Sequence, residues 1–163
     1  MANIILIGMP GSGKSTVGVL LAKTLGIGFT DTDLLIQQRE KRLLQDIIDS
    51  DGIDFFLDCE ANAVLSLDCD NTVIATGGSV IFREKAMSHL KKMGRIIYLD
   101  VEVDELKRRL SNIKTRGIAA RRGETVEEIY SERAELYSEY ADYTLKFAMG
   151  TAEDAVSKIC KIL

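Results

Sequence analysis

Residues 8–15 have the sequence Gly-Met-Pro-Gly-Ser-Gly-Lys-Ser, which fits the pattern GxxxxGK[ST] at every fixed position. The stretch follows a short apolar run at Asn3–Ile7 and precedes an amphipathic helix that we expect over Lys14–Leu25. In that setting the glycines allow successive backbone N–H groups to turn inward onto a polyphosphate, and the helix N-terminus adds a positive potential. The sequence therefore predicts a phosphate-binding loop between a buried strand and a helix.

The side chains of this loop predict how a nucleoside triphosphate, ATP or GTP, is bound. Lys14 would reach the β- and γ-phosphates, and the hydroxyl of Ser15 would coordinate Mg²⁺. A glycine-rich turn that binds nothing is the alternative, but the flanking strand and helix argue against it. The residues that we expect to contact the nucleotide here are Gly11, Ser12, Gly13, Lys14, Ser15 and Thr16.

Outside this loop, short apolar and β-branched runs alternate with helical patterns. The alternation predicts an α/β fold, a three-layer α/β/α sandwich around a five-stranded, parallel sheet. Ligands of such sheets bind at the carboxyl ends of the strands. A mobile lid is expected at residues 111–124, which contain two glycines and four basic residues. Strands are expected over Asn3–Ile7, Ile27–Thr30, Thr72–Ala75, Arg95–Leu99 and Tyr143–Phe147.

Length and composition limit the classes of protein to consider. The 163 residues suit one domain, 1–163, and no linker or repeat is visible. A net charge of −4 argues against general binding to nucleic acid or to an acidic membrane. No apolar run approaches the roughly 18 residues of a membrane span, and the N-terminus lacks the pattern of a secretory signal. Three cysteines without metal-site spacing, Cys59, Cys69 and Cys160, indicate free thiols in a cytoplasmic protein.

Two carboxylates follow the second expected strand, in the run Phe29-Thr30-Asp31-Thr32-Asp33. Carboxylates beside a phosphate site can hold Mg²⁺ and can orient or deprotonate an attacking hydroxyl. Capping of the next helix is the alternative use for Asp31 or Asp33. Beside a phosphate-binding loop we favour the functional interpretation.

Further motifs follow in a fixed order along essentially the whole chain. They are GMPGSGKSTVG at 8–18, DTD at 31–33, Gly52-x-x-x-Phe56-x-x-x-Glu60, Ala75-Thr76-Gly77-Gly78-Ser79, the basic loop with Arg116, and Arg133-x-x-Leu136-Tyr137 followed by Ala141-Asp142. Each motif alone is weak, but their order and spacing together are specific. In these motifs the sequence resembles the shikimate kinase family, whose members have a P-loop fold like that of nucleoside monophosphate kinases.

The resemblance implies catalytic roles for residues that match the motifs of the family. Asp31 would contribute to the Mg²⁺ shell, and Asp33 would bind the substrate hydroxyls and act as the base. Arg116 would close over the transferred phosphoryl group as a lid arginine, together with Lys14. Without the family context, a solubilising role in a polar loop is equally ordinary for Arg116.

The resemblance also implies binding roles. Backbone N–H groups of Gly77 and Gly78 would approach the substrate where a side chain would block it. Arg133 would grip the substrate carboxylate, and Arg109 matches the position that stacks near the adenine. For either arginine, a solvated position on an amphipathic helix is the alternative.

One departure from the family pattern affects acceptor recognition directly. The family has an arginine after the motif phenylalanine, where this chain has Leu57, and in the family it clamps the substrate carboxylate with the later arginine. Loss of one bidentate charged contact weakens binding by roughly 2–4 kcal/mol. Arg121 and Arg122 are candidates to replace it.

Other departures lie close to the same half of the expected site. Ser79 replaces the usual third glycine, and the lid has Gly117-Ile118 after Arg116 where the family usually has Pro-Leu. Glu135 stands in place of a proline and brings a negative charge near Arg133 along the sequence. The phosphate-handling motifs are therefore intact, whereas those for the acceptor are altered.

The resemblance implies an ATP-dependent kinase that uses Mg²⁺ and converts shikimate to shikimate 3-phosphate. A different small hydroxylated metabolite, or a nucleoside or nucleotide, is the alternative acceptor for a kinase of this fold. An ATP-binding switch without catalysis is a further alternative, but Lys14, Ser15, Asp31 and Asp33 speak against it. We expect a monomer without nucleic-acid or membrane partners.

Overall fold

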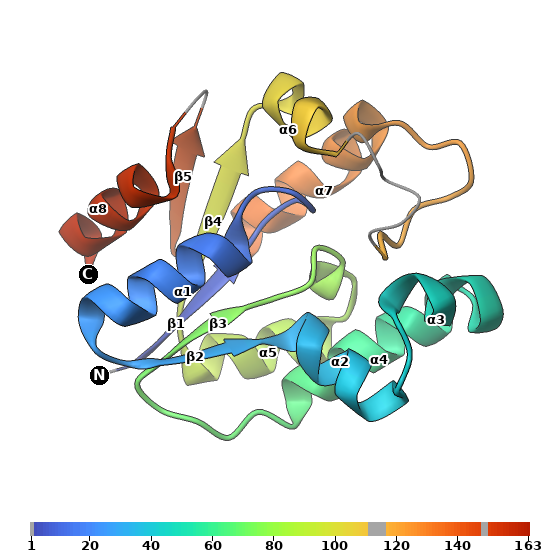
Figure 1. Cartoon of the computed structure of the whole chain (residues 1–163), viewed down its shortest axis with the longest axis horizontal. Coiled ribbons are helices and arrows are strands. Elements are labelled where there is room, and N and C mark those ends of the chain that lie inside the picture. Colours follow the sequence, from blue (N-terminus) through green and yellow to red (C-terminus); the bar gives the residue numbers. More distant parts are fainter. Residues whose placement is uncertain (1, 111–116, 148–149) are drawn as a thin grey trace.

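The computed structural model describes residues 2–110, 117–147 and 150–163 of the chain. The described strands form a five-stranded sheet in the order β2-β3-β1-β4-β5, and every neighbouring pair is parallel (Figure 1). The parallel α/β sheet that the sequence predicts is thus confirmed. The strands are β1 (Asn3–Ile7), β2 (Gly28–Asp31), β3 (Thr72–Ala75), β4 (Gly94–Val101) and β5 (Tyr143–Phe147).

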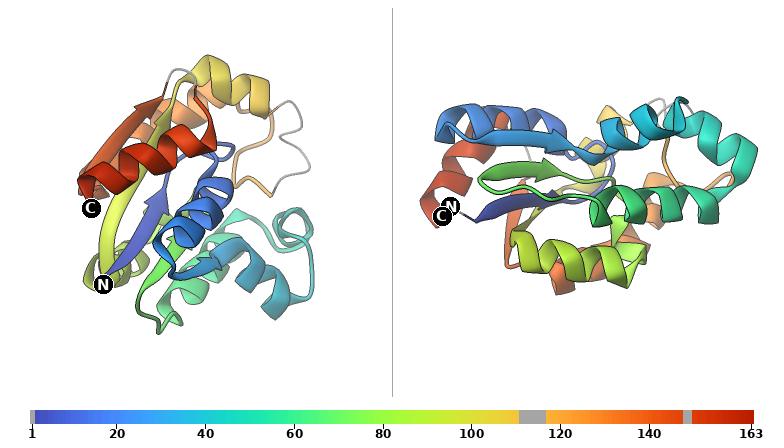
Figure 2. Two further views of the ribbon diagram at one scale, coloured as in Figure 1. Left: turned by 60° about the vertical axis from the view of Figure 1, so that its left-hand side comes forward. Right: turned by 90° about the horizontal axis from the view of Figure 1, so that it is seen from below.

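Helices cover both faces of this sheet. α1 and α8 lie on one face, and α5 and α7 lie on the other (Figure 2). α2 and α3 project beyond the edge of the sheet at β2, next to α4 (Figure 1). The helical elements are α1 (Lys14–Leu25), α2 (Thr32–Glu40), α3 (Leu44–Asp51), α4 (Ile53–Leu65), the 3₁₀ turn η1 (Val80–Phe82), α5 (Glu84–Met93), α6 (Val103–Arg109), α7 (Val126–Tyr140) and α8 (Ala152–Ile162).

The central strands are buried on both faces, as parallel strands between helix layers must be. Every residue of β1 and β3 is buried, and their aliphatic side chains form the centre of the main hydrophobic core. Asn3 is the one polar residue of β1, and its side chain bonds the backbone of Cys69, Thr72 and Met93. A buried amide is therefore satisfied while it joins the amino-terminal ends of neighbouring segments.

A second, smaller core lies between α2, α3 and α4, beyond the edge of the sheet. Its buried side chains are Ile36, Leu44, Ile47, Phe56, Leu57, Ala63 and Ala119. Ala119 belongs to the predicted lid, residues 111–124, so part of that segment packs in the second core. Within the described residues, no helix is both long enough and apolar enough to cross a membrane.

Glycine conformation and helix capping determine where α1 and α2 begin. Gly13 precedes α1 with a φ of 91°, a conformation that a residue with a side chain rarely adopts. Asp31 ends β2 and caps α2, because its Oδ1 accepts a hydrogen bond of 2.9 Å from the backbone N–H of Asp33. The capping use considered for this aspartate is thus present.

Candidate active site

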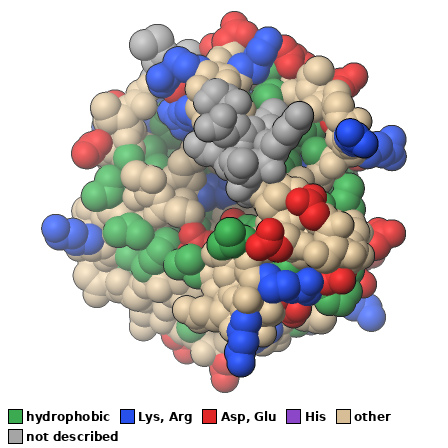
Figure 3. Space-filling view, turned by 45° about the vertical axis from the view of Figure 1, so that its right-hand side comes forward, with side chains coloured by type: hydrophobic (Ala, Val, Ile, Leu, Met, Phe, Trp, Pro, Cys, Tyr) green, Lys and Arg blue, Asp and Glu red, His purple; other side chains and the backbone are tan. Residues whose placement is uncertain are grey.

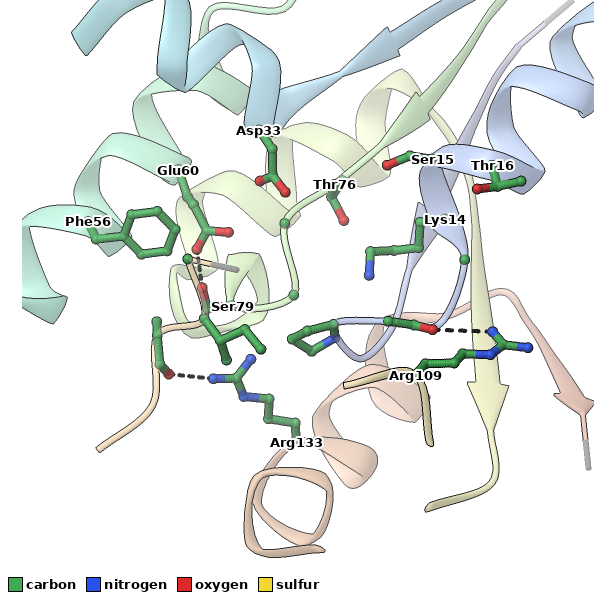
Figure 4. Close-up of a pocket in the computed structure, with 18 residues that line it drawn as sticks. Lys14, Ser15, Thr16, Asp33, Phe56, Glu60, Thr76, Ser79, Arg109 and Arg133 are labelled. Carbon is green, nitrogen blue, oxygen red and sulfur yellow. Dashed lines mark hydrogen bonds between the residues drawn. The ribbon is translucent and has the colours of Figure 1, made fainter. Parts of the chain in front are cut away.

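A cavity of about 660 Å³ opens at the carboxyl ends of β1, β2 and β3. The space-filling view shows a hollow on this face with basic side chains inside it (Figure 3). Residues from the loop after β1, from α2, α4 and α7, and from the turn after β3 surround it (Figure 4). Its lining includes Pro10, Gly11, Gly13, Lys14, Ser15, Thr16, Asp33, Phe56, Glu60, Thr76, Gly77, Gly78, Ser79, Arg109, Gly117, Ile118, Ala119 and Arg133.

The ammonium group of Lys14 is held by the loop that precedes it. Its Nζ donates to the carbonyl oxygens of Gly8 (2.9 Å) and Met9 (2.8 Å) and to Oγ of Ser12 (3.3 Å). Burial lowers the pKa of Lys14 to about 8, against the opposing charges of Asp33 and Asp31. A phosphate group entering the loop would supply the negative charge that this buried cation lacks.

Ser15 and Asp31 form a pair of oxygen ligands at the start of α1. The Ser15 hydroxyl donates to Oδ2 of Asp31 at 2.6 Å, while Oδ1 of Asp31 is used in the cap of α2. In the described part of the chain, no group of three or more His, Cys, Asp or Glu side chains could hold a metal ion. The donors present fit Mg²⁺, which binds through one or two oxygen side chains and takes its other ligands from phosphate and water.

Asp33 lies on the first turn of α2 and faces the cavity (Figure 4). Its Oδ1 is buried and has no hydrogen-bond partner within the described residues. Burial first, and then the charge of Asp31, raise the pKa of Asp33, while Lys14 opposes both, and the net result is a pKa of about 6. A buried oxygen without a partner is costly unless a ligand completes its hydrogen bonding.

Glu60 on α4 is a site residue that the sequence contributed only as part of a family motif. Its side chain is 2% exposed and lines the cavity, the Ser79 hydroxyl donates to its Oε2, and its Oε1 has no partner within the described residues. Burial raises the pKa of Glu60 to about 8, and Asp33 adds to the shift. The available signal was a carboxylate aligned at helical spacing with Phe56 and Ala63, where an apolar side chain is expected.

Arg133 is buried, with 1% of its surface exposed, so it is not a solvated surface arginine. Its Nη2 donates to the Ala119 carbonyl oxygen at 2.6 Å, and its guanidinium lies 5.2 Å from the centre of the Phe82 ring. Nε and Nη1 are buried and lack partners within the described residues. Two adjacent donors on one guanidinium are suited to a carboxylate, which accepts both in parallel.

Gly77 lies where two unpartnered oxygens converge. A Cβ atom on Gly77 would stand 1.8 Å from Oε1 of Glu60 and 3.0 Å from Oδ1 of Asp33, so a side chain here would displace the carboxyl group of Glu60. A Cβ atom on Gly78 would stand 2.8 Å from Cδ of Pro10. The backbone therefore borders the cavity directly, between the phosphate-binding loop and the two acidic side chains.

α7 holds the Gly77–Gly78 turn in place. The Tyr137 hydroxyl donates to the Gly78 carbonyl oxygen, and its ring stacks on Tyr98 with centroids 5.0 Å apart. Tyr137 thus connects the turn to β4 through one buried side chain.

Arg109 marks the boundary with a second cavity of about 240 Å³. Its Nη1 donates to the Gly11 carbonyl oxygen at 3.2 Å, and its Nε donates to Oε1 of Glu105 at 2.7 Å. The second cavity is lined by Ser12, Gly13, Thr16, Val17, Leu99, Val101, Arg109, Phe147, Gly150, Thr151, Ala152 and Ala155. Arg109 therefore borders both the phosphate loop and a partly apolar cavity.

Leu57 does not line the main cavity. Its side chain is 7% exposed, packs in the second core, and borders a separate cavity of about 360 Å³. Arg121 is exposed and borders the same separate cavity, and Arg122 is exposed as well. Neither is found in the described lining of the main cavity, so neither takes the place of the missing arginine there.

Two other sequence predictions have different outcomes. Glu135 is exposed on α7 and is not among the described lining residues of the cavity, so the negative charges near Arg133 come from elsewhere. Arg116 and the predicted lid segment 111–116 lie outside the described residues.

We expect Leu57→Arg to lower the free energy of unfolding by about 2 kcal/mol, because it places a charge in a buried apolar cluster. Urea unfolding measures the difference, and Leu57→Met, which keeps size and polarity, is the matched control. Glu124 and Glu132 border the separate cavity and could pair with the new guanidinium. An unchanged urea midpoint for Leu57→Arg would mean that such pairing offsets the cost, contrary to our expectation.

Comparison with known proteins places these features in a family. The family profile described as "Shikimate kinase" matches residues 10–163. A shikimate kinase of Rippkaea orientalis is 38% identical over 165 residues, which cover 99% of this chain and 87% of that protein. A shikimate kinase of Clostridium botulinum is 32% identical over 162 residues, which cover 99% of this chain and 96% of that protein.

Solved structures agree with the sequence comparison. Shikimate kinase from Acinetobacter baumannii, in complex with shikimate, is 30% identical with a TM-score of 0.92, covering 99% of this chain and 92% of that one. Shikimate kinase from Aquifex aeolicus is 32% identical with a TM-score of 0.83, covering 98% of this chain and 94% of that one. The chain therefore belongs to the shikimate kinase family.

Proposed function

We propose that this chain transfers the γ-phosphoryl group of ATP to a hydroxyl of shikimate and releases ADP and shikimate 3-phosphate. The observation that carries the proposal is one cavity that joins Lys14 in a phosphate-binding loop, the unpartnered Oδ1 of Asp33, and the unpartnered Nε and Nη1 of Arg133. These groups match a polyphosphate, a hydroxyl and a carboxylate. The bound shikimate in the Acinetobacter baumannii relative supports the choice of acceptor.

Phosphate binding depends on the loop after β1 and on the start of α1. Backbone N–H groups of residues 11–16 and the ammonium of Lys14 hold the β- and γ-phosphates and stabilise negative charge as the phosphoryl group moves. Ser15 and Asp31 would hold Mg²⁺, which neutralises phosphate charge when it is bound. Lys14 regains a counter-charge when the nucleotide enters, which favours its protonated form.

Asp33 takes the acceptor proton. Its unpartnered Oδ1 accepts a hydrogen bond from the shikimate hydroxyl. The oxygen of that hydroxyl attacks the γ-phosphorus as the bond from phosphorus to the β–γ bridging oxygen breaks. The proton passes to the carboxylate of Asp33, and the electron pair of the broken bond leaves with ADP. A bond to phosphorus forms and one breaks, so atoms and charge balance.

The ends of the two ligands are held by two arginines. Arg133 binds the shikimate carboxylate through Nε and Nη1, while Ala119 and Phe82 keep the guanidinium in place. Arg109 and the second cavity receive the adenine. We further propose that Arg116 acts as the lid arginine, and that the protein is a cytoplasmic monomer.

Release of ADP from purified protein with MgATP and shikimate tests the function. We expect turnover with shikimate, and phosphorus NMR should identify a phosphomonoester on the 3-hydroxyl. No turnover at millimolar shikimate, but turnover with another small hydroxylated metabolite, would contradict the acceptor assignment and retain the kinase. The second acceptor class is worth including because Leu57 leaves one guanidinium fewer than the family pattern.

A further inference from the structure

Glu60 places a buried carboxyl group in the cavity that the proposed phosphoryl transfer does not use. It is a carboxyl with 2% exposure, and it lies on the acceptor side with Asp33 and Arg133 (Figure 4). Its hydrogen-bond partner is the neutral Ser79, and none of the ion pairs among the described residues involves it. An ionised carboxylate in such a position is costly without a paired cation.

The net charge of the side chains around the acceptor also favours a neutral Glu60. Of the described ionisable side chains lining the cavity, Lys14 and Arg109 lie on the nucleotide side, and Asp33, Glu60 and Arg133 lie on the acceptor side. With Glu60 ionised, the acceptor side carries a net charge of about −1, and an acceptor carboxylate would add to it. With Glu60 neutral, that net charge is about zero.

We propose that Glu60 binds the acceptor as a neutral, proton-bearing carboxyl group positioned by Ser79, and so keeps the acceptor side of the cavity, where Arg133 is the one cation among the described lining residues, free of net negative charge. The inference deepens the proposed function and rests on it for the identity of the acceptor. It concerns Ser79, where the family usually has a third glycine, and a carboxyl group to which the sequence assigned no role.

The hydrogen bonds assign the proton to one oxygen. Oε2 accepts from the Ser79 hydroxyl and therefore acts as the carbonyl oxygen of the neutral group. Oε1 has no partner within the described residues and lies against Gly77, close to Oδ1 of Asp33. Oε1 therefore carries the proton and donates it in a hydrogen bond to an oxygen of the bound acceptor.

The surroundings of Glu60 favour this state. Burial first, and then the charge of Asp33, raise the pKa of Glu60, whereas the Ser79 hydrogen bond, Arg133 and Lys14 lower it, and the net result is a pKa of about 8. The facing groups come from several elements: Lys14 on α1, Asp33 on α2, Ser79 before η1, and Arg133 and Tyr137 on α7. Above pH 8 Glu60 ionises and opposes an acceptor carboxylate.

Acceptor binding as a function of pH tests the proposal. With saturating MgATP, we expect KM for shikimate to rise roughly 30-fold from pH 7 to pH 9.5, as one group ionises. Glu60→Gln keeps a neutral donor, so KM should be several-fold higher at pH 7 but should lose this alkaline rise. Ser79→Ala removes a bond that favours the ionised form, so the rise should move to higher pH. Glu135→Gln, an exposed carboxylate on α7, is the matched control and should keep the original profile.

Infrared spectroscopy of the free protein provides a readout that needs no turnover. At pH 7 we expect a carbonyl stretch from a protonated carboxyl group that is absent from Glu60→Gln and that disappears above pH 8. No such band at pH 7, or a KM for shikimate that stays flat to pH 9.5 in the original protein, would overturn the proposal. If Glu60→Gln fails to fold, Ser79→Ala and the original protein still decide it. Absence of shikimate turnover with the infrared band present would contradict the proposed acceptor alone.

Discussion

Replacing Lys14 by methionine should lower kcat for phosphoryl transfer about 1,000-fold. Lys14 is the cation buried in the phosphate-binding loop, where three acceptors aim its ammonium group, and methionine keeps the length but removes the charge. In a buried site, a fixed positive charge stabilises the migrating phosphoryl group much more than it would in water. ADP release measures kcat, and calorimetry measures nucleotide affinity, which should also fall.

The control for Lys14→Met lies on the same helix. Lys23 is exposed on the last turn of α1, and Lys23→Met removes the same charge from the protein without touching the cavity. It should leave kcat within a factor of two. A kcat for Lys14→Met within tenfold of the original would contradict the assigned role, provided that thermal unfolding shows both variants folded.

Replacing Asp33 by asparagine should lower kcat by about 1,000-fold while changing the KM for shikimate much less. Asparagine can still hydrogen-bond a hydroxyl, so acceptor binding is largely kept, but an amide cannot take the proton that the hydroxyl loses. The loss should therefore appear in the chemical step, seen as a slow single turnover with saturating ligands.

Asp46→Asn is the matched control for Asp33→Asn, because Asp46 is an exposed aspartate in the first turn of the neighbouring helix α3. It should behave as the original protein. If Asp33→Asn kept its kcat and raised only KM, Asp33 would be a binding residue, and the acceptor proton would go elsewhere.

The centre of the sheet could be predicted from the sequence because β1, β3 and β4 carry buried, mostly aliphatic runs. Limits of elements were less predictable: β4 spans Gly94–Val101 where the sequence predicts Arg95–Leu99. η1 ends at Phe82 and α5 begins at Glu84, because Arg83 between them has an extended backbone. A pattern of apolar spacing carries no information about that single backbone change.

The phosphate half of the site could be predicted because its residues are consecutive, so that spacing along the chain gives proximity in space. The acceptor half brings together residues far apart in the sequence. The bond between Ser79 and Glu60 joins residues 19 positions apart, and Arg133 is buried although its helix is largely polar. Leu57 stands next to Phe56 in the chain but borders a different cavity, which only the packing of α4 reveals.

α7 carries both Arg133 and Tyr137, which lie about one helical turn apart. Tyr137 holds the Gly78 carbonyl, and Tyr130 of the same helix donates to Asp100, which Tyr98 also contacts (2.9 and 3.1 Å). Arg133, which we propose binds the acceptor, and Tyr137, which holds the Gly77–Gly78 turn, are therefore fixed to one helix. A displacement of α7 would therefore change the position of the Arg133 guanidinium and that of the Gly77–Gly78 turn together.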